Sequence, residues 1–178
     1  MNLTLTPLTE ADPAAVEALL DAAFGADRRG RTAYRLREGA TAIPTLSFAA
    51  WQDARLVGTL QSWPVALQTG ADTDKLVMVG PVAVVPDVQG AGVGKALMDR
   101  LIAAADAQRA GALVMIGDPE YYERWGFTAD GASGWRIDGP YEQRRLLARL
   151  RRKTAASGEL VALGPSRAGG NLAEIAAL

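Results

Sequence analysis

The sequence predicts a mixed α/β (α+β) fold, with helices flanking a sheet of six or seven strands. Short runs of β-branched and aromatic residues alternate along the chain with segments of helical periodicity. An amphipathic helix over 92–107 separates a strand that starts at Val77 from an apolar strand over 112–117. A strand, helix and strand in this order form a right-handed crossover between parallel strands. We therefore expect both strands in one sheet, with a ligand at their carboxyl ends.

The N-terminal residues form one strand and one helix. Residues 3–6 alternate apolar and polar side chains, which is typical of a short half-buried strand. The next segment has apolar residues at helical spacing as far as Gly25. Thr9 and Asp12 at its start form a capping pair. This pattern predicts a helix that ends at the glycine.

An arginine-rich segment follows this helix and ends near Gly39. Its arginines are Arg28, Arg29, Arg31, Arg35 and Arg37. We interpret the segment as a short helix whose charges form a solvated face, which is the common role of such charges. The alternative is that they steer an acidic ligand or lie over its anionic groups.

Two strands over 45–51 and 55–67 form a hairpin, because both carry aromatic or β-branched residues and a short turn joins them. Trp51 and Trp63 are candidates for lining a ligand pocket, although a strand Trp is more often partly buried packing. A polar loop over 70–74 leads to the next strand.

That next strand contains Pro81, which has no N–H to donate to a ladder. Strand pairing must therefore be interrupted there by a bulge or a splay. The backbone groups of Val82, Ala83 and Val84 would then face a ligand instead of a neighbouring strand. An edge strand is the alternative, because it also tolerates proline.

The C-terminal part contains a short helix from Asp118 to the glycine at position 126, then a segment over 134–137 and a second one over 141–150, of which the second is predicted to be a strand. We expect one domain over residues 1–150 and a C-terminal tail over 151–178. Residues 171–178 are predicted to form one or two apolar helical turns that dock on the domain or on a partner. The basic run over 144–153 is interpreted as solvated charge.

Composition excludes several classes of chemistry. The 178 residues carry a net charge of -1, from 19 basic and 20 acidic residues, which argues against a nucleic-acid partner. The chain has no Cys and no His, so thiol nucleophiles, Ser-His-Asp triads and most zinc sites are excluded, and we expect no metal. Neither a leader pattern nor a membrane-spanning run occurs, which predicts a cytoplasmic protein without a membrane partner.

A glycine-rich turn leads directly into the helix over 92–107. Gly90, Gly92 and Gly94 let backbone amides approach a ligand, and the helix start favours negative charge, so this turn is a candidate phosphate site. A P-loop needs Ser or Thr where Ala96 stands. A dinucleotide fingerprint needs a small residue where Lys95 or the leucine at position 97 stands, depending on the frame.

The glycine turn, Gln-Gly-Ala-Gly-Val-Gly over 89–94, resembles the Gln/Arg-x-x-Gly-x-Gly/Ala signature of the GNAT superfamily of N-acetyltransferases. A second element, Tyr-Tyr-Glu-Arg-Trp-Gly-Phe over 121–127, resembles the family's Phe-Tyr-Glu-Arg/Lys-x-Gly-Phe, with Tyr in place of the first Phe. The stretches 79–84 and 117–119 are similar to the YhbS-like branch. The two motifs stand in the family's order, and the resemblance covers residues 3–150.

This resemblance implies a GNAT-like mixed sheet that is splayed at the Val82 strand, with acetyl-CoA as co-substrate. The implied coenzyme-binding residues are Val82, Ala83, Val84, Gln89, Gly90, Ala91, Gly92, Val93, Gly94 and Lys95. A primary amine of a small molecule or peptide would attack the thioester directly. Tyr122 corresponds to the family's general acid and Tyr121 to its apolar Phe. The base stays open among Asp118, Glu120, Glu123 and a water chain.

Two other functions remain open at this point. The chain could be a non-catalytic acyl-CoA-binding regulatory module, or a nucleotide-binding protein in which Asp118 contacts a ribose. The spacing of the glycines does not match a P-loop or a dinucleotide fingerprint, which argues against a nucleotide ligand. The sequence is also compatible with a homodimer.

Overall fold

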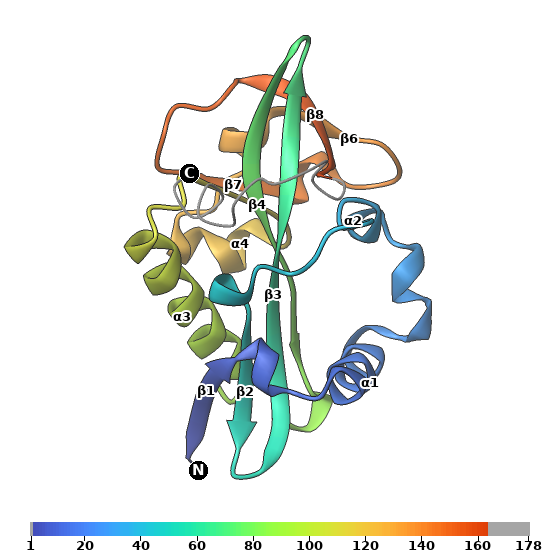
Figure 1. Cartoon of the computed structure of the whole chain (residues 1–178), viewed down its shortest axis with the longest axis vertical. Coiled ribbons are helices and arrows are strands. Elements are labelled where there is room, and N and C mark those ends of the chain that lie inside the picture. Colours follow the sequence, from blue (N-terminus) through green and yellow to red (C-terminus); the bar gives the residue numbers. More distant parts are fainter. Residues whose placement is uncertain (1, 164–178) are drawn as a thin grey trace.

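In the computed structural model, which describes residues 2–163, one eight-stranded sheet is flanked by helices (Figure 1). The strand order is β1-β2-β3-β4-β5-β7, and β8 pairs with both β3 and β6. Only the β4–β5 and β6–β8 pairs are parallel among the described residues. The strands are β1 (Leu3–Pro7), β2 (Phe48–Gln52), β3 (Arg55–Thr69), β4 (Asp72–Val84), β5 (Ala112–Ile116), β6 (Gly134–Ile137), β7 (Leu146–Leu150) and β8 (Ser157–Ala162). The predicted fold class and the parallel crossover are thereby confirmed, and the sheet has eight strands instead of the six or seven predicted.

The helices lie on both sides of the long β3–β4 hairpin (Figure 1). They are α1 (Pro13–Phe24), α2 (Thr32–Arg35), α3 (Val93–Ala107) and α4 (Pro119–Tyr122). Asp12 alone caps α1, since its carboxylate accepts the amide of Ala15 at 3.2 Å. The predicted capping role of Thr9 is wrong, because Thr9 lies in a separate 3₁₀ turn, Leu8–Glu10. Within residues 2–163, no helix has the length and apolar character needed to cross a membrane.

The sheet is covered on both faces, and alternate residues of its central strands serve two different cores. In β4, Val77 and Val79 belong to the cluster that contains α1 and α3, whereas Leu76 and Met78 belong to a second cluster with β6, β7 and β8. Successive strand side chains point to opposite faces, so a strand buried on both faces has a continuous apolar sequence. This explains the unbroken apolar run over 76–79 of β4.

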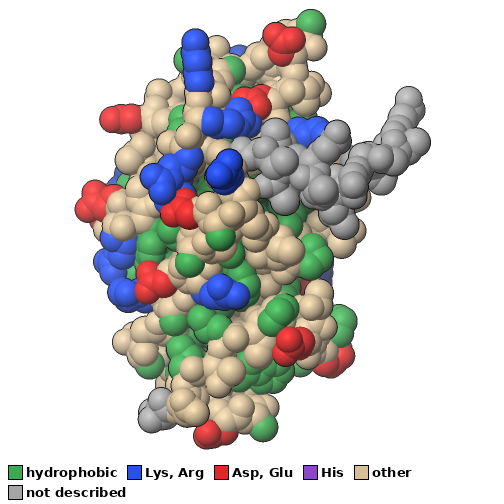
Figure 2. Space-filling view, turned by 60° about the vertical axis from the view of Figure 1, so that its left-hand side comes forward, with side chains coloured by type: hydrophobic (Ala, Val, Ile, Leu, Met, Phe, Trp, Pro, Cys, Tyr) green, Lys and Arg blue, Asp and Glu red, His purple; other side chains and the backbone are tan. Residues whose placement is uncertain are grey.

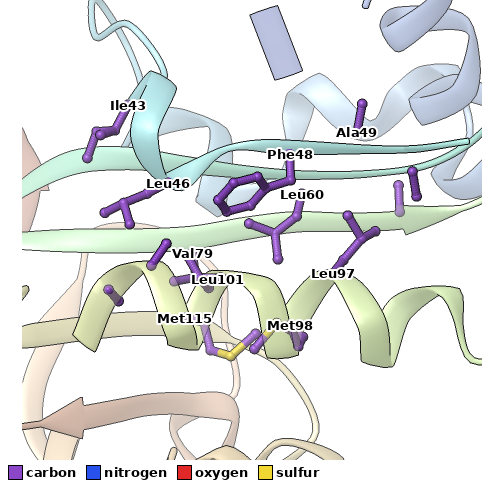
Figure 3. Close-up of a cluster of buried hydrophobic side chains, with 14 of the residues drawn as sticks. Ile43, Leu46, Phe48, Ala49, Leu60, Val79, Leu97, Met98, Leu101 and Met115 are labelled. Atoms are coloured by element: carbon purple, nitrogen blue, oxygen red, sulfur yellow. The ribbon is translucent and has the colours of Figure 1, made fainter. Parts of the chain in front are cut away.

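The first core fixes α3 against the sheet (Figure 3). Phe48 and Leu60 point from the strands toward Leu97 and Leu101 of the helix. A Cβ at Gly58 would come within 2.8 Å of a methyl carbon of Val93, so this glycine permits the close approach of the first turn of α3. The start of the helix is therefore fixed beside the end of β4.

Two strand boundaries differ from the prediction near the hairpins. β2 begins at Phe48 because Pro44–Leu46 forms a 3₁₀ turn. β4 begins at Asp72, so the predicted polar loop over 70–74 shrinks to a two-residue turn, with Gly70 at a φ of 63°. Polar residues on an exposed strand end resemble a loop in sequence.

The C-terminal region also differs. The predicted strand over 141–150 is limited to β7, because Gln143–Arg145 forms a 3₁₀ turn. The eighth strand, β8, comes from the segment assigned to the tail, and it pairs antiparallel with β3 and parallel with β6. The helical turns predicted over 171–178 lie outside the described residues.

Candidate active site

β4 and β5 separate at the middle of β4. The two strands pair in parallel only at Val77 and Met78, although β4 continues to Val84. Beyond the separation, Val82, Ala83 and Val84 pair with β3 on one edge, and no strand of the described chain pairs with their other edge. The splay predicted at the Val82 strand is confirmed, and it leaves strand backbone available to a ligand.

Pro81 lies at the origin of this separation. The register between β3 and β4 shifts between Leu60 and Ser62, so that the single residue between them faces both Gly80 and Pro81. Proline supplies no N–H to the ladder, which explains the bulge. The indole Nε1 of Trp63 donates to the carbonyl of Gly80 at 2.9 Å and fixes the bulged backbone.

The glycine turn lies between the end of β4 and the start of α3. Gly90 and Gly92 have φ angles of 85° and 84°, and a Cβ at either position would meet nothing within 4 Å. Gly92 is the N-cap of α3 and no side chain caps this helix. The first intrahelical bond is donated by Ala96 to Gly92 at 3.0 Å, so the preceding helix amides have no intrahelical acceptor. Open space and unpaired donors fit a phosphate group.

Polar contacts hold the turn in place. The side-chain Nε2 of Gln89 donates to the backbone carbonyl of Val84 at 3.2 Å. In the 3₁₀ turn Pro86–Val88, Asp87 accepts two bonds from Arg55, at 2.6 and 2.8 Å. The bidentate pair joins the turn to the start of β3.

The Lys95 ammonium is paired within its own helix. It lies 2.6 Å from Asp99, whose second carboxylate oxygen accepts the indole N–H of Trp125 at 2.8 Å. The bonds from Lys95 and Trp125 lower the pKa of Asp99. This carboxylate therefore connects the predicted coenzyme turn to the segment that carries the two tyrosines.

Tyr121 and Tyr122 point to different places. The Tyr121 hydroxyl oxygen would lie 3.6 Å from a Cβ at Gly94, so this partly exposed tyrosine faces the glycine turn. Tyr122 lines a cavity beside the splay, and its ring covers Gly117 so closely that a Cβ there would come within 2.5 Å of it. Among the described residues, no hydrogen bond ties the Tyr122 hydroxyl to the backbone.

The Tyr122 phenol resists ionisation. Burial raises its pKa from 10.0 to about 12, aided by Tyr121 and Asp118 and opposed by Arg145. The phenol is therefore protonated at neutral pH, as a proton donor must be. Its contribution to stability is fully present below about pH 10 and is lost as the pH rises toward about 12, because the unfolded chain ionises first.

A phenolate absorbance titration tests this environment. Of the four tyrosines in the chain, we expect Tyr122 to ionise last, so Tyr122→Phe should remove the absorbance step at the highest pH. Circular dichroism at each pH would verify that the protein is still folded. Loss of an earlier step instead would contradict the buried position of this phenol.

The cavity has a volume of about 950 Å³ and opens at the splay of the sheet. Its walls come from the bulge of β4, the end of β5, α4, the arginine-rich segment and the turn before β7. Of the three carboxylates considered as a base, Asp118 lines it, 3.3 Å from Arg145, whereas Glu120 and Glu123 do not. Neither Trp51 nor Trp63 lines this cavity.

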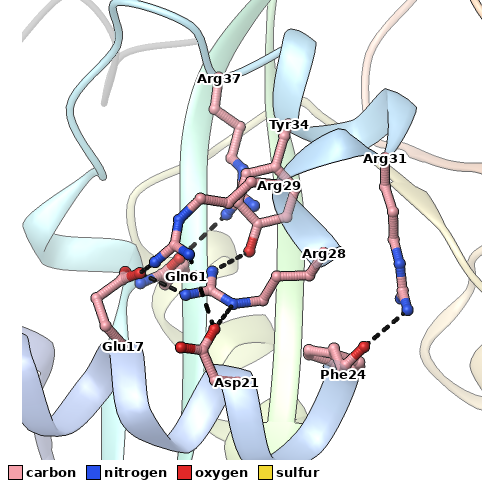
Figure 4. Close-up of polar contacts among 9 residues, drawn as sticks. All are labelled: Glu17, Asp21, Phe24, Arg28, Arg29, Arg31, Tyr34, Arg37 and Gln61. Carbon is pink, nitrogen blue, oxygen red and sulfur yellow. Dashed lines mark hydrogen bonds and ion pairs between the residues drawn. The ribbon is translucent and has the colours of Figure 1, made fainter. Parts of the chain in front are cut away.

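The interpretation of the arginine-rich segment as a solvated face is wrong for two of its members. Arg28 is 1% exposed and Arg37 is 8% exposed. Arg28 donates to Asp21 at 2.7 Å and also contacts Glu17 and the hydroxyl of Tyr34 (Figure 4). The segment is a 3₁₀ turn, Ala26–Gly30, followed by α2, and it forms one wall of the cavity.

On the face drawn in Figure 2, basic and acidic side chains are interspersed among hydrophobic ones. This mixed distribution differs from the continuous basic stripe that is typical of nucleic-acid-binding surfaces. Within residues 2–163, no group of three or more acidic side chains gathers in a geometry suited to a metal ion.

A splayed mixed sheet with a glycine turn at the start of the following helix defines a class of acyl-coenzyme A-binding folds. The family model of the acetyltransferase (GNAT) domain matches residues 4–129 of the chain. The chain therefore belongs to the GNAT acetyltransferase family. It is 29% identical over 105 residues to the uncharacterized N-acetyltransferase YjhQ of Escherichia coli strain K12. That match covers 59% of this chain and only 58% of the relative's length.

Solved structures share the fold. The GNAT N-acetyltransferase YhbS from Escherichia coli, in complex with CoA, matches with a TM-score of 0.70 and 20% identity, over 90% of this chain and 89% of that chain. A GNAT acetyltransferase from Brucella melitensis, in complex with acetyl-CoA, matches with a TM-score of 0.64 and 23% identity, over 90% and 95% of the two chains. The resemblance predicted from the two sequence motifs is confirmed.

Proposed function

We propose that the protein transfers an acetyl group from acetyl-CoA to a primary amine of a small molecule or peptide. The observation that carries this proposal is the separation of β4 from β5 beside the glycine turn, with Tyr122 in the cavity at that separation. Family membership supports acetyl transfer, and the two relatives with CoA or acetyl-CoA bound support the co-substrate. We further propose that the protein acts in the cytoplasm.

The residues around the splay fit acetyl-CoA. The amides of the turn over 89–95 would hold the pyrophosphate, since Gly90 and Gly92 leave open space in front of them. The free edge formed by Val82, Ala83 and Val84 would bond the pantetheine as a further strand does. When bound, acetyl-CoA supplies a thioester whose carbonyl is open to attack.

The chemistry needs no covalent enzyme intermediate, which suits a chain without Cys or His. The amine nitrogen forms a bond to the acetyl carbon, and the carbon–sulfur bond breaks. A backbone amide near Val82 stabilises the carbonyl oxygen as negative charge develops on it. Tyr122 gives its phenolic proton to the leaving sulfur. We propose Asp118, which lines the same cavity, as the acceptor of the ammonium proton.

Thermal-shift titration followed by a thiol-release assay tests the proposal. Acetyl-CoA should stabilise the protein, whereas NAD and ATP should not, and some member of an amine and peptide panel should accelerate thiol release. Because the chain has no Cys, every thiol detected comes from CoA. Stabilisation without release by any acceptor would favour the non-catalytic acyl-CoA-binding module, and stabilisation by NAD or ATP would favour the nucleotide-binding alternative.

Replacing Gly92 by alanine should weaken acetyl-CoA binding about tenfold to hundredfold, because a left-handed alanine is strained and the amides of the turn shift away from the phosphate. Isothermal titration with acetyl-CoA measures the effect. Gly70→Ala is the matched control: Gly70 also has positive φ and open space around a Cβ, but it lies in the distant β3–β4 turn. Equal affinities in the two variants would place the pyrophosphate elsewhere.

A further inference from the structure

Arg37 is a buried cation without a carboxylate partner among the described residues. Its side chain is 8% exposed, and no ion pair includes it, whereas Arg28 beside it contacts both Glu17 and Asp21. A guanidinium has five N–H donors, and one of them donates to the side-chain oxygen of Gln61 at 3.2 Å. Buried charges in proteins are normally paired, so an unpaired one indicates that the anion comes from outside the chain.

The guanidinium is held in a fixed position. Its central carbon lies 3.5 Å from the ring centroid of Tyr34, which Figure 4 shows beside it. The ring centroid of Trp63 is 5.0 Å from the same carbon. Tyr34 is held in turn by its contact with Arg28. Contacts of this kind between a guanidinium and aromatic rings hold the group in place, and a guanidinium can still donate hydrogen bonds in its own plane. Because the arginine side chain is already ordered, binding an anion to it costs little conformational entropy.

Arg37 and Tyr122 line the same cavity of about 950 Å³. This volume lies within the range of small-molecule sites in proteins, about 300–1,000 Å³. Arg31 also lines the cavity, and its guanidinium donates to the backbone carbonyl of Phe24 at 2.9 Å. The proposed proton donor and a positively charged anchor therefore belong to one compartment.

We propose that the acetyl acceptor carries a carboxylate in addition to its amine, and that Arg37 binds this carboxylate while the amine lies at the Tyr122 end of the cavity. The assignment rests on the proposed function, which it narrows to amino acids and related acidic amines. A carboxylate matches the planar fork of a guanidinium with two parallel hydrogen bonds. Arg37 acts as a specificity-determining residue and takes no part in the bond changes.

Matched acceptor pairs test the assignment. Each pair consists of an amine with a free carboxylate and the same amine with that group converted to an amide; α-amino acids, ω-amino acids of increasing length and dipeptides with an acidic side chain supply the pairs. Thiol release should favour the acid over its amide about tenfold to hundredfold in kcat/KM. The free amino acids and the peptides distinguish the two sources of the same carboxylate.

Variants then assign the preference to one residue. Arg37→Gln should raise KM for the acids about tenfold to hundredfold and leave the amides unchanged, so that the preference disappears. Arg37→Lys should restore part of it, because lysine keeps the charge but not the fork. Arg35→Gln is the control, since Arg35 belongs to the same segment but is exposed and does not line the cavity.

The outcomes separate the two proposals. If acids and amides react equally in the unmodified protein, or if Arg37→Gln slows both equally while Arg35→Gln slows neither, the carboxylate assignment is overturned and acetyl transfer stands. If acetyl-CoA binds but no acceptor releases thiol, the proposed function fails and the assignment fails with it. Should Arg37→Gln not fold, the acid-to-amide ratio of the unmodified protein and the Arg37→Lys variant still decide.

Discussion

Replacing Tyr122 by phenylalanine is expected to lower kcat for acetyl transfer about hundredfold to ten-thousandfold while leaving the affinity for acetyl-CoA unchanged. The substitution removes one hydroxyl oxygen, and the ring still packs over Gly117 and against Phe127. A thiolate that leaves without a proton is a poorer leaving group, so the loss should appear in the chemical step. Initial rates of thiol release and a calorimetric acetyl-CoA titration measure the two quantities.

Tyr121→Phe is the informative comparison, because the two tyrosines are adjacent but Tyr121 faces the glycine turn and Tyr122 lines the cavity. The Tyr121 hydroxyl faces the glycine turn, so its loss should affect acetyl-CoA affinity more than kcat. If Tyr122→Phe kept full activity at every pH and Tyr121→Phe lost most of its activity, Tyr121 instead of Tyr122 would be the proton donor. The high pKa of Tyr122 further predicts that its ionisation causes no loss of activity below about pH 10.

Replacing Trp135 by alanine is expected to reduce the free energy of unfolding by about 3–5 kcal/mol. Trp135 is fully buried, at 0% exposure, in the second core, and its indole N–H donates to the carbonyl of Ala155 at 2.8 Å. The substitution creates a large cavity between β6 and the segment that leads into β8. Guanidinium unfolding followed by circular dichroism measures the loss.

Trp135→Phe separates the two contributions. Phenylalanine fills most of the volume and loses the hydrogen bond, so it should cost clearly less than alanine. Hydrogen exchange should be fastest in β6 and β8 in the alanine variant, because these strands lose their common contact. A loss of stability below about 1 kcal/mol for Trp135→Ala would mean that the second core closes without this side chain.

The local sequence pattern was sufficient to predict those elements whose structure depends mainly on their own residues. The helix predicted over 92–107 corresponds to α3, because its apolar stripe is long and a glycine, Gly92, stands at its N-cap. Pro81 predicted the interruption of β4, since a missing N–H acts on the ladder regardless of the rest of the fold. The coenzyme role of the residues around these two features stays a prediction.

Long-range contacts explain what the pattern did not predict. Arg28 is buried because Glu17 and Asp21 of α1 accept its hydrogen bonds, and nothing in the arginine-rich segment itself records those partners. β8 was missed because it begins with Ser, Gly and Glu, which have no strand pattern of their own, and it forms a strand by pairing with β3 and β6. The acidic and basic residues of the cavity come together from segments far apart in the chain.

The pairing of β8 with both β3 and β6 has a consequence for the order of events during synthesis. Residues 65–68 of β3 cannot acquire their final partner until residues 159–162 have left the ribosome. This edge of β3 is therefore unpaired until the last strand of the sheet has been synthesised. Contacts of such sequence separation form slowly. We expect the nascent chain to complete its sheet only after translation has passed β8.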